Sequence, residues 1–140
     1  MSETLWLVIA CGVIAVLYGL ITARQIISLS AGNERMQTIA AAIQEGAAAY
    51  LNKQYTAIAA VGVVVAIILF VTLGWTSAVG FLIGAILSGI AGYAGMLVSV
   101  RANVRTTEAS RKGLAEGLSV SFRSGAVTGM LVAGLALLAI

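Results

Sequence analysis

The chain has 140 residues, of which 61% are hydrophobic and only 9% are charged, with eight Lys and Arg against five Asp and Glu. Soluble domains carry about 25% charged residues, so this composition predicts an integral membrane protein. The sequence contains no His and no Asp. Ser-His-Asp and Cys-His catalysis, His-ligated zinc and Asp-bound magnesium clusters are therefore excluded from this chain by itself. Its single cysteine, Cys11, excludes an intrachain disulfide.

An uncharged run from Thr4 to Ala23 predicts the first transmembrane helix, over about residues 4–29. A helix needs about 20 apolar residues to cross the hydrocarbon core of a bilayer. A signal peptide is the alternative, and it would begin with positive charge and end at a small-residue cleavage site. Here the first charge is Glu3 and no Lys or Arg precedes Arg24, so we expect a retained helix.

The next segment is polar enough to lie at the membrane surface. Gly32 is a candidate helix stop and Asn33 a candidate N-cap, and apolar residues then recur at steps of three and four. This pattern predicts an amphipathic helix over about residues 33–53. Glu45 is its most conspicuous acid, and we interpret it as a surface carboxylate because no second acid lies nearby in the sequence.

Residues 54–100 contain no charge, which is too long for one crossing. The polar break at residues 74–77 divides them into predicted spans over about 55–73 and 77–100. Small residues recur every four positions in the second of these spans, at Gly80, Gly84, Ser88 and Gly92. Rows of this kind allow membrane helices to pack closely, so this span is predicted to contact other helices.

Residues 101–123 carry five of the eight basic residues, and an uncharged run then predicts a fourth span over about 123–140. All eight Lys and Arg lie within 24–53 or 101–123. Cytoplasmic loops are enriched in Lys and Arg, so both basic segments are predicted to be cytoplasmic and the N-terminus to lie outside. The sequence thus predicts an all-α membrane fold of four transmembrane helices plus a cytoplasmic amphipathic helix.

Arg101, Asn103 and Arg105 are the candidate functional residues. A basic cytoplasmic helix end could attract an anionic substrate. The simpler interpretation, which we favour, is that these residues anchor the helix end and set its orientation. Glu108 is expected to pair with Arg111 or Lys112 one turn further along.

Three classes of membrane protein have this size and composition: small multidrug exporters, rotor-ring proteolipids, and parts of larger pumps or transporters. The first two need a carboxylate inside the membrane, and no predicted span contains one. The sequence therefore favours scaffold helices of a larger protein. The alternative is a stand-alone small membrane transporter or accessory subunit, which a stop codon after Ile140 would support.

Three blocks in this order resemble the N-terminal part of membrane-bound, ion-translocating inorganic pyrophosphatases: GNERMQTIAAAIQEGAAAYLNKQYTAIAAVG, GFLIGAILSGIAGYAGMLVSVRANVRTTEASRKGL and FRSGAVTGMLV. The resemblance is strongest from Gly32 onward, and the sequence is most similar to bacterial proton-pumping members. It implies a homodimer of sixteen-helix subunits in the bacterial cell (inner) membrane, with this chain as its first four helices. It also implies hydrolysis of magnesium pyrophosphate coupled to export of H⁺, or in some members of Na⁺.

The Asp-rich loops that hold Mg²⁺ in this family have no counterpart here. We therefore predict no catalytic, cofactor-binding or metal-binding residue in this chain, and we expect the fragment alone to be inactive. Its expected partners are membrane lipid, the remaining helices of the pump and a second subunit, with pyrophosphate as substrate of the whole protein and no nucleic acid. The choice between H⁺ and Na⁺, and any need for K⁺, would be determined by helices outside this chain.

Overall fold

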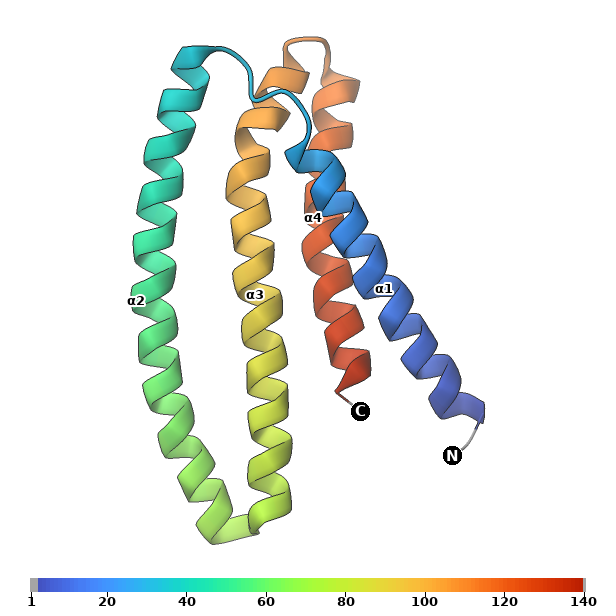
Figure 1. The fold of residues 1–140 in the computed structure, drawn as a ribbon, viewed down its shortest axis with the longest axis vertical. Coiled ribbons are helices and arrows are strands. Elements are labelled where there is room, and N and C mark those ends of the chain that lie inside the picture. The colour runs from blue at the N-terminus through green and yellow to red at the C-terminus, as the bar shows by residue number, and fades with distance from the viewer. Residues whose placement is uncertain (1–2, 140) are drawn as a thin grey trace.

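The computed structural model describes residues 3–139, which form four α-helices joined by short connections. Their bounds are α1 Glu3–Ile27, α2 Glu34–Leu73, α3 Trp75–Ser110 and α4 Leu114–Leu138 (Figure 1). All four are long and apolar enough to cross a membrane. The prediction of an all-α protein with four membrane-spanning helices is therefore confirmed.

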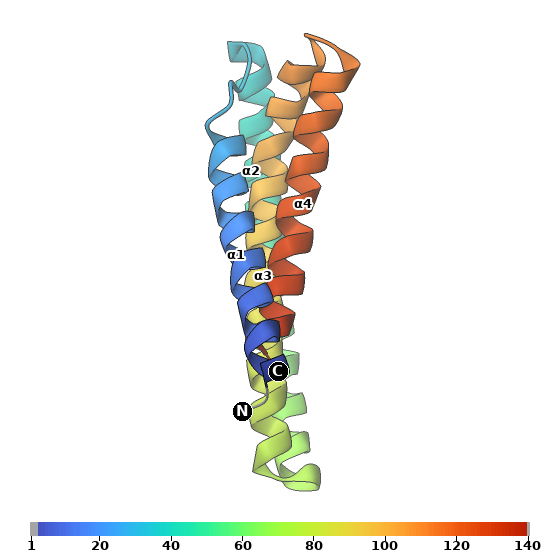
Figure 2. The same cartoon turned by 90° about the vertical axis from the view of Figure 1, so that its right-hand side faces the viewer.

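The helices run alternately up and down (Figure 1). Helix α4 packs against both α1 and α3, whereas α2 packs against α3 alone among the described elements. Figure 1 shows α2 on one side of α3 with α1 and α4 on the other, and in Figure 2 α1 and α4 lie in front of α3 with α2 behind it. The α1–α2 and α3–α4 connections share one end of the bundle, and both chain ends point toward the opposite end (Figure 1). The two basic segments predicted from the sequence therefore approach the same end.

Helices α2, α3 and α4 are longer than the predicted spans, whereas α1 ends at Ile27 rather than near residue 29. The predicted amphipathic helix and second span are one continuous helix of 40 residues, α2. The polar residues Asn52, Lys53 and Gln54 mark a change of environment, but none of them breaks a helix as Gly or Pro would. Similarly, α3 continues through Arg101 to Ser110, and α4 begins at Leu114 rather than near residue 123. The expected N-cap is confirmed, because the Asn33 side chain accepts a 3.0 Å hydrogen bond from the Met36 amide.

Two glycines make the turns possible. Gly74 alone separates α2 from α3 and has φ of 85°, and Gly32 in the α1–α2 connection has φ of 76°. Side chains other than Gly rarely adopt such angles. The predicted turn over residues 74–77 is thus a single residue, and Trp75 already belongs to α3.

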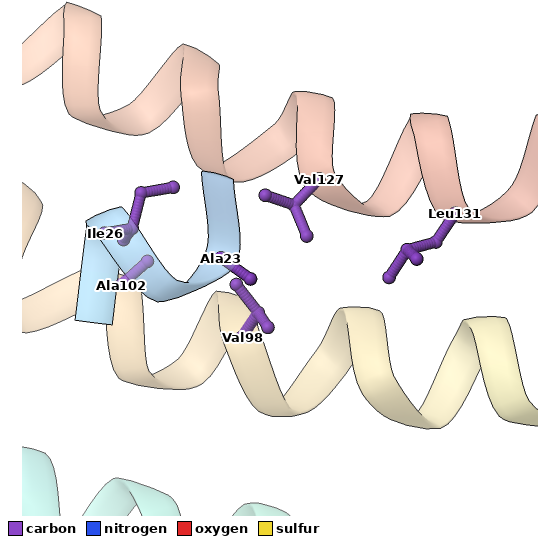
Figure 3. Packing of buried hydrophobic residues seen from close by; sticks show 6 residues of the cluster. All are labelled: Ala23, Ile26, Val98, Ala102, Val127 and Leu131. Carbon is purple, nitrogen blue, oxygen red and sulfur yellow. The ribbon is translucent and has the colours of Figure 1, made fainter. Parts of the chain in front are cut away.

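The buried core lies where α1, α3 and α4 meet (Figure 3). Its side chains point toward one another from these three helices: Ala23 and Ile26, Val98 and Ala102, and Val127 and Leu131. Ile26 and Val127 are completely buried. Alanine at two of the six positions lets the backbones approach closely, as membrane helices require when lipid removes the usual hydrophobic driving force.

The backbones of α1 and α4 approach closely at a glycine pair that no sequence pattern predicted. A Cβ atom placed on Gly134 of α4 would lie 2.8 Å from the Gly12 carbonyl oxygen of α1. By contrast, Gly80 and Gly84 of the predicted ladder have no atom of another element within 4 Å of such a Cβ. At Gly92 of the ladder, and at Gly89 beside it, Tyr55 of α2 lies within 4 Å of such a Cβ.

These surroundings predict opposite effects for one substitution at two positions of α4. Gly134→Ala should destabilise the protein by about 1–3 kcal/mol, because the new methyl group meets backbone that must move. Gly129→Ala should stabilise it by up to about 1 kcal/mol, because Ala favours helix and no atom of another element lies within 4 Å of the new Cβ. Unfolding in mixed micelles by titration with sodium dodecyl sulfate measures both. Equal effects at the two sites would contradict the Gly12–Gly134 crossing.

Candidate functional site

The Arg105 side chain crosses from α3 to the C-terminal end of α1. Its Nε donates hydrogen bonds to the carbonyl oxygens of Ile27 at 3.0 Å and Leu29 at 3.1 Å. Its Nη2 donates to the Ile27 oxygen at 2.7 Å, and its Nη1 donates to the Arg101 oxygen at 2.7 Å. All three guanidinium nitrogens are therefore bonded to backbone oxygens of this chain.

This arrangement follows from the way α1 ends. The last carbonyls of any helix lack partners within the helix and carry partial negative charge. After Ile27 the chain turns away, with only the Ser28 and Leu29 amides bonding back to α1. A planar guanidinium with several fixed donors suits adjacent carbonyl oxygens, and its positive charge suits a helix C-terminus. Arg105 thus caps α1 from a neighbouring helix.

A second arginine reaches the same end of α1 from α4. Arg123 Nη2 donates a hydrogen bond to the side-chain oxygen of Gln25. Neither residue was predicted to be functional, although Arg123 directly precedes the uncharged run of the fourth predicted span and so lies at the predicted membrane boundary. Helix α1 is therefore held at this end by one arginine from α3 and one from α4.

The three candidate residues do not converge on one site. Arg105 binds α1, whereas Asn103 lines a cavity of about 170 Å³ with Met36 and Ile39. Arg101 is exposed and borders a separate small cavity of about 70 Å³ beside Gln44. A binding site for a multiply charged anion needs several donors that point to one place, and this arrangement does not provide that. The geometry favours the anchoring role over substrate attraction.

A more open groove of about 460 Å³ lies at the same end of the bundle. It is bordered by residues of the α1–α2 connection, α3 and α4, and its charged residues are Glu108, Lys112, Glu116 and Arg123. Two acids and two bases leave it without a dominant charge. Glu108 pairs with Arg111 across 3.0 Å, which confirms the expected ion pair. The groove therefore has no charge preference for an anion or for a metal ion.

The acidic residues of the described chain also form no cluster that could hold a metal ion. No group of three or more His, Cys, Asp or Glu side chains converges within residues 3–139. Glu45 lies on α2, away from Glu108 and Glu116, which border the groove at the α3–α4 connection. Magnesium prefers several oxygen ligands in octahedral geometry, commonly including carboxylates. The carboxylates of the described chain do not fit a Mg²⁺ cluster.

Comparison with known proteins connects this scaffold to one family. The family model described as inorganic H⁺ pyrophosphatase matches residues 13–140. A K⁺-insensitive pyrophosphate-energized proton pump of Methanosarcina mazei is 48% identical over 129 residues, which cover 91% of this chain and 19% of that protein. The K⁺-insensitive pyrophosphate-energized proton pump 2 of Moorella thermoacetica is 44% identical over 132 residues, covering 94% of this chain and 19% of that protein.

A further relative is named for a different ion. A putative K⁺-stimulated pyrophosphate-energized sodium pump of Clostridium tetani is 44% identical over 122 residues, covering 87% of this chain and 18% of that protein. The chain therefore spans about a fifth of the length of these relatives. The identities to the Moorella proton pump and to the sodium pump are the same, so this segment does not separate the two ions.

The contacts of Arg105 predict that its removal weakens the fold more than removal of a neighbouring surface arginine. Arg105→Gln should lower the free energy of unfolding by about 2 kcal/mol, because charged hydrogen bonds to the carbonyls of α1 are lost. Arg111→Gln is the matched control, since its exposed ion pair is worth at most about 1 kcal/mol. Unfolding by sodium dodecyl sulfate compares the two variants. An Arg105 variant as stable as the Arg111 variant would contradict the capping role.

Proposed function

The chain belongs to the inorganic H⁺ pyrophosphatase family, and from this premise we propose that it forms scaffold helices of a pyrophosphate-energised proton pump. The family membership confirms the resemblance predicted from the sequence. We propose that the chain corresponds to the N-terminal helices of the pump, and that the whole protein couples hydrolysis of magnesium pyrophosphate to export of H⁺. Its share of this task is to support the helices that carry the reaction.

The main support for a scaffold role is the use of Arg105. A residue that prepares a site for pyrophosphate would keep its donors available, whereas all three guanidinium nitrogens of Arg105 are bonded to backbone oxygens. The interiors of the helices agree with this. Residues 4–23, 54–100 and 124–140 contain no charged side chain. Proton pathways through membranes commonly use buried ionisable groups, which these runs lack.

We further propose that Mg²⁺ and pyrophosphate bind to parts of the pump outside this chain. Bound Mg²⁺ would neutralise the charge on the phosphoryl oxygens during hydrolysis. The scattered carboxylates of this chain support that assignment, because they do not fit the metal. Homodimer formation and location in a bacterial inner membrane belong to the same proposal and rest on the family resemblance.

The proposed orientation places the N-terminus outside and the basic segments in the cytoplasm. Its support is the distribution of charge: all eight Lys and Arg lie within residues 24–53 or 101–123, and none precedes α1 or lies in the α2–α3 turn. The α1–α2 connection lies within the first basic segment and the α3–α4 connection within the second. Because both connections lie at one end of the bundle, a single orientation places both segments on the same side of the membrane.

We expect the 140-residue chain alone to release no phosphate from magnesium pyrophosphate. The complete pump should hydrolyse it and acidify the compartment outside the cytoplasm without added Na⁺. Phosphate release and quenching of a pH-sensitive dye in inverted vesicles measure the two activities. In the complete pump, Arg105→Ala should leave the KM for pyrophosphate unchanged. Hydrolysis by the isolated chain, or proton transport that requires Na⁺, would contradict the proposal.

Cysteine labelling tests the orientation. In a Cys11→Ala background, Thr76→Cys places a thiol at the α2–α3 turn and Lys112→Cys places one at the α3–α4 connection. Both parent residues are exposed. In intact cells, a membrane-impermeant maleimide should label the T76C variant and should label the K112C variant only after permeabilisation. The reverse pattern would invert the proposed topology.

A further inference from the structure

The outer face of α2 is covered by no other element of the described chain. This helix packs against α3 alone, through a side that includes its buried residues Ala40 and Leu51. Tyr50 and Lys53 are three residues apart and therefore neighbours on the helix surface. Successive residues turn by about 100°, so Lys53 lies about 160° around the helix from Leu51 and about 60° from Tyr50. The Tyr50 side chain is 61% exposed, and Lys53 is also exposed.

The depth of Lys53 in the bundle follows from contacts between α2 and α3. Tyr55 packs edge-on against Tyr93 with ring centroids 5.3 Å apart, and its hydroxyl lies 2.7 Å from where a Cβ of Gly92 would be. Tyr55 is therefore level with Gly92. Arg101 is nine residues beyond Gly92, or about 13 Å, and Lys53 is two residues beyond Tyr55, or about 3 Å. Lys53 thus lies about 10 Å deeper in the bundle than Arg101.

The basic boundary of the other helices is close to Arg101. Arg105 binds the Ile27 carbonyl, which places Arg24 of α1 near the level of Arg101. A membrane surface drawn through Arg24 and Arg101 leaves Lys53 below it. Within residues 3–139, Lys53 makes no hydrogen bond and no ion pair, and Glu45, the nearest acid along α2, is eight residues away, or about 12 Å. A cation at such a depth is costly unless it pairs with another group or its side chain reaches the headgroup layer.

The chemistry of this face indicates what the partner is. Beyond Lys53, in the direction of the membrane interior, the same face of α2 continues through four apolar side chains that are each more than half exposed: Val61, Val64, Ile68 and Val71. A soluble phosphate would gain nothing from this strip. A phospholipid offers both an anionic group for Lys53 and acyl chains for the strip, and tyrosine is enriched at the depth of lipid headgroups.

We propose that Tyr50 and Lys53 bind the headgroup of an anionic phospholipid whose acyl chains lie along the strip from Val61 to Val71. The Lys53 ammonium group extends along α2 toward the headgroup layer and pairs with the lipid phosphate. The Tyr50 hydroxyl, one turn nearer the surface, donates a second hydrogen bond to the headgroup. This site is independent of pyrophosphate hydrolysis, and it requires that the outer face of α2 face lipid in the complete pump.

The test measures the lipid preference of the complete pump in nanodiscs of dioleoylphosphatidylcholine that contain a minor fraction of dioleoylphosphatidylglycerol. Native mass spectrometry reports the ratio of the two lipids retained by the protein. Lys53→Gln should lower the preference for phosphatidylglycerol about fivefold, the effect of one cation near an anionic lipid surface. Lys53→Arg should retain most of the preference, and Tyr50→Phe should reduce it to a lesser degree.

Arg35→Gln is the matched control, because it removes one positive charge from the same helix 18 residues, or about 27 Å, away. It should leave the preference unchanged. Circular dichroism verifies that each variant keeps its helix content. An unchanged preference in the K53Q variant overturns the proposal, as does an equal loss in the R35Q variant, which would indicate general attraction of charge. Loss of stability in the K53Q variant without loss of lipid preference would instead identify a carboxylate of another helix as the partner, and also overturns it.

Discussion

The need to satisfy the last carbonyls of α1 is the constraint on which the arrangement of this bundle depends. A helix end near a membrane boundary cannot leave its carbonyl oxygens without partners. Arg105 supplies those partners from α3 and so fixes α3 relative to α1 along the bundle axis. With that register set, Ala23 and Ile26 face Val98 and Ala102 in the core. This polar contact at the boundary thus acts together with the Arg123–Gln25 bond and the Gly12–Gly134 crossing to set which apolar side chains meet inside.

The helices differ in length, so the register of α3 against α1 also decides which polar residues lie at which depth in the membrane. Helices α1 and α4 have 25 residues each, or about 38 Å, whereas α2 has 40 and α3 has 36, or about 60 and 54 Å. The longer pair must extend past the shorter pair, and its uncharged sequence is displaced toward the α2–α3 turn. The polar residues at the middle of α2 therefore lie deeper than the basic residues of the other helices. A single flat membrane boundary does not fit all four helices equally well.

Much of this fold could be predicted from the sequence, because each signal was local. Uncharged runs predicted the four helices, and the Asn33 cap needed only the residues that follow it. Helix ends were less predictable, since charge marks where the bilayer stops and does not stop a helix: α2 passes through Lys53 without interruption. The Gly12–Gly134 crossing could not be predicted, because the two glycines are 122 residues apart in the chain and their contact depends on the register of α1 against α4. The four-residue ladder indicated packing correctly at Gly92 but could not show that Gly80 and Gly84 lack a neighbour in this chain.

The candidate site shows a related distinction between the presence of charge and its availability. The sequence identifies Arg101 and Arg105 equally, as two cations one helical turn apart at a cytoplasmic helix end. The structure separates them, because the guanidinium of Arg105 is bonded to backbone oxygens while Arg101 remains exposed. A bonded arginine at a helix C-terminus stabilises the fold and has few donors left for an anion, and the helix dipole offsets part of its charge. Basic residues at membrane boundaries therefore indicate orientation reliably, but their contacts must be known before any of them is assigned to a substrate.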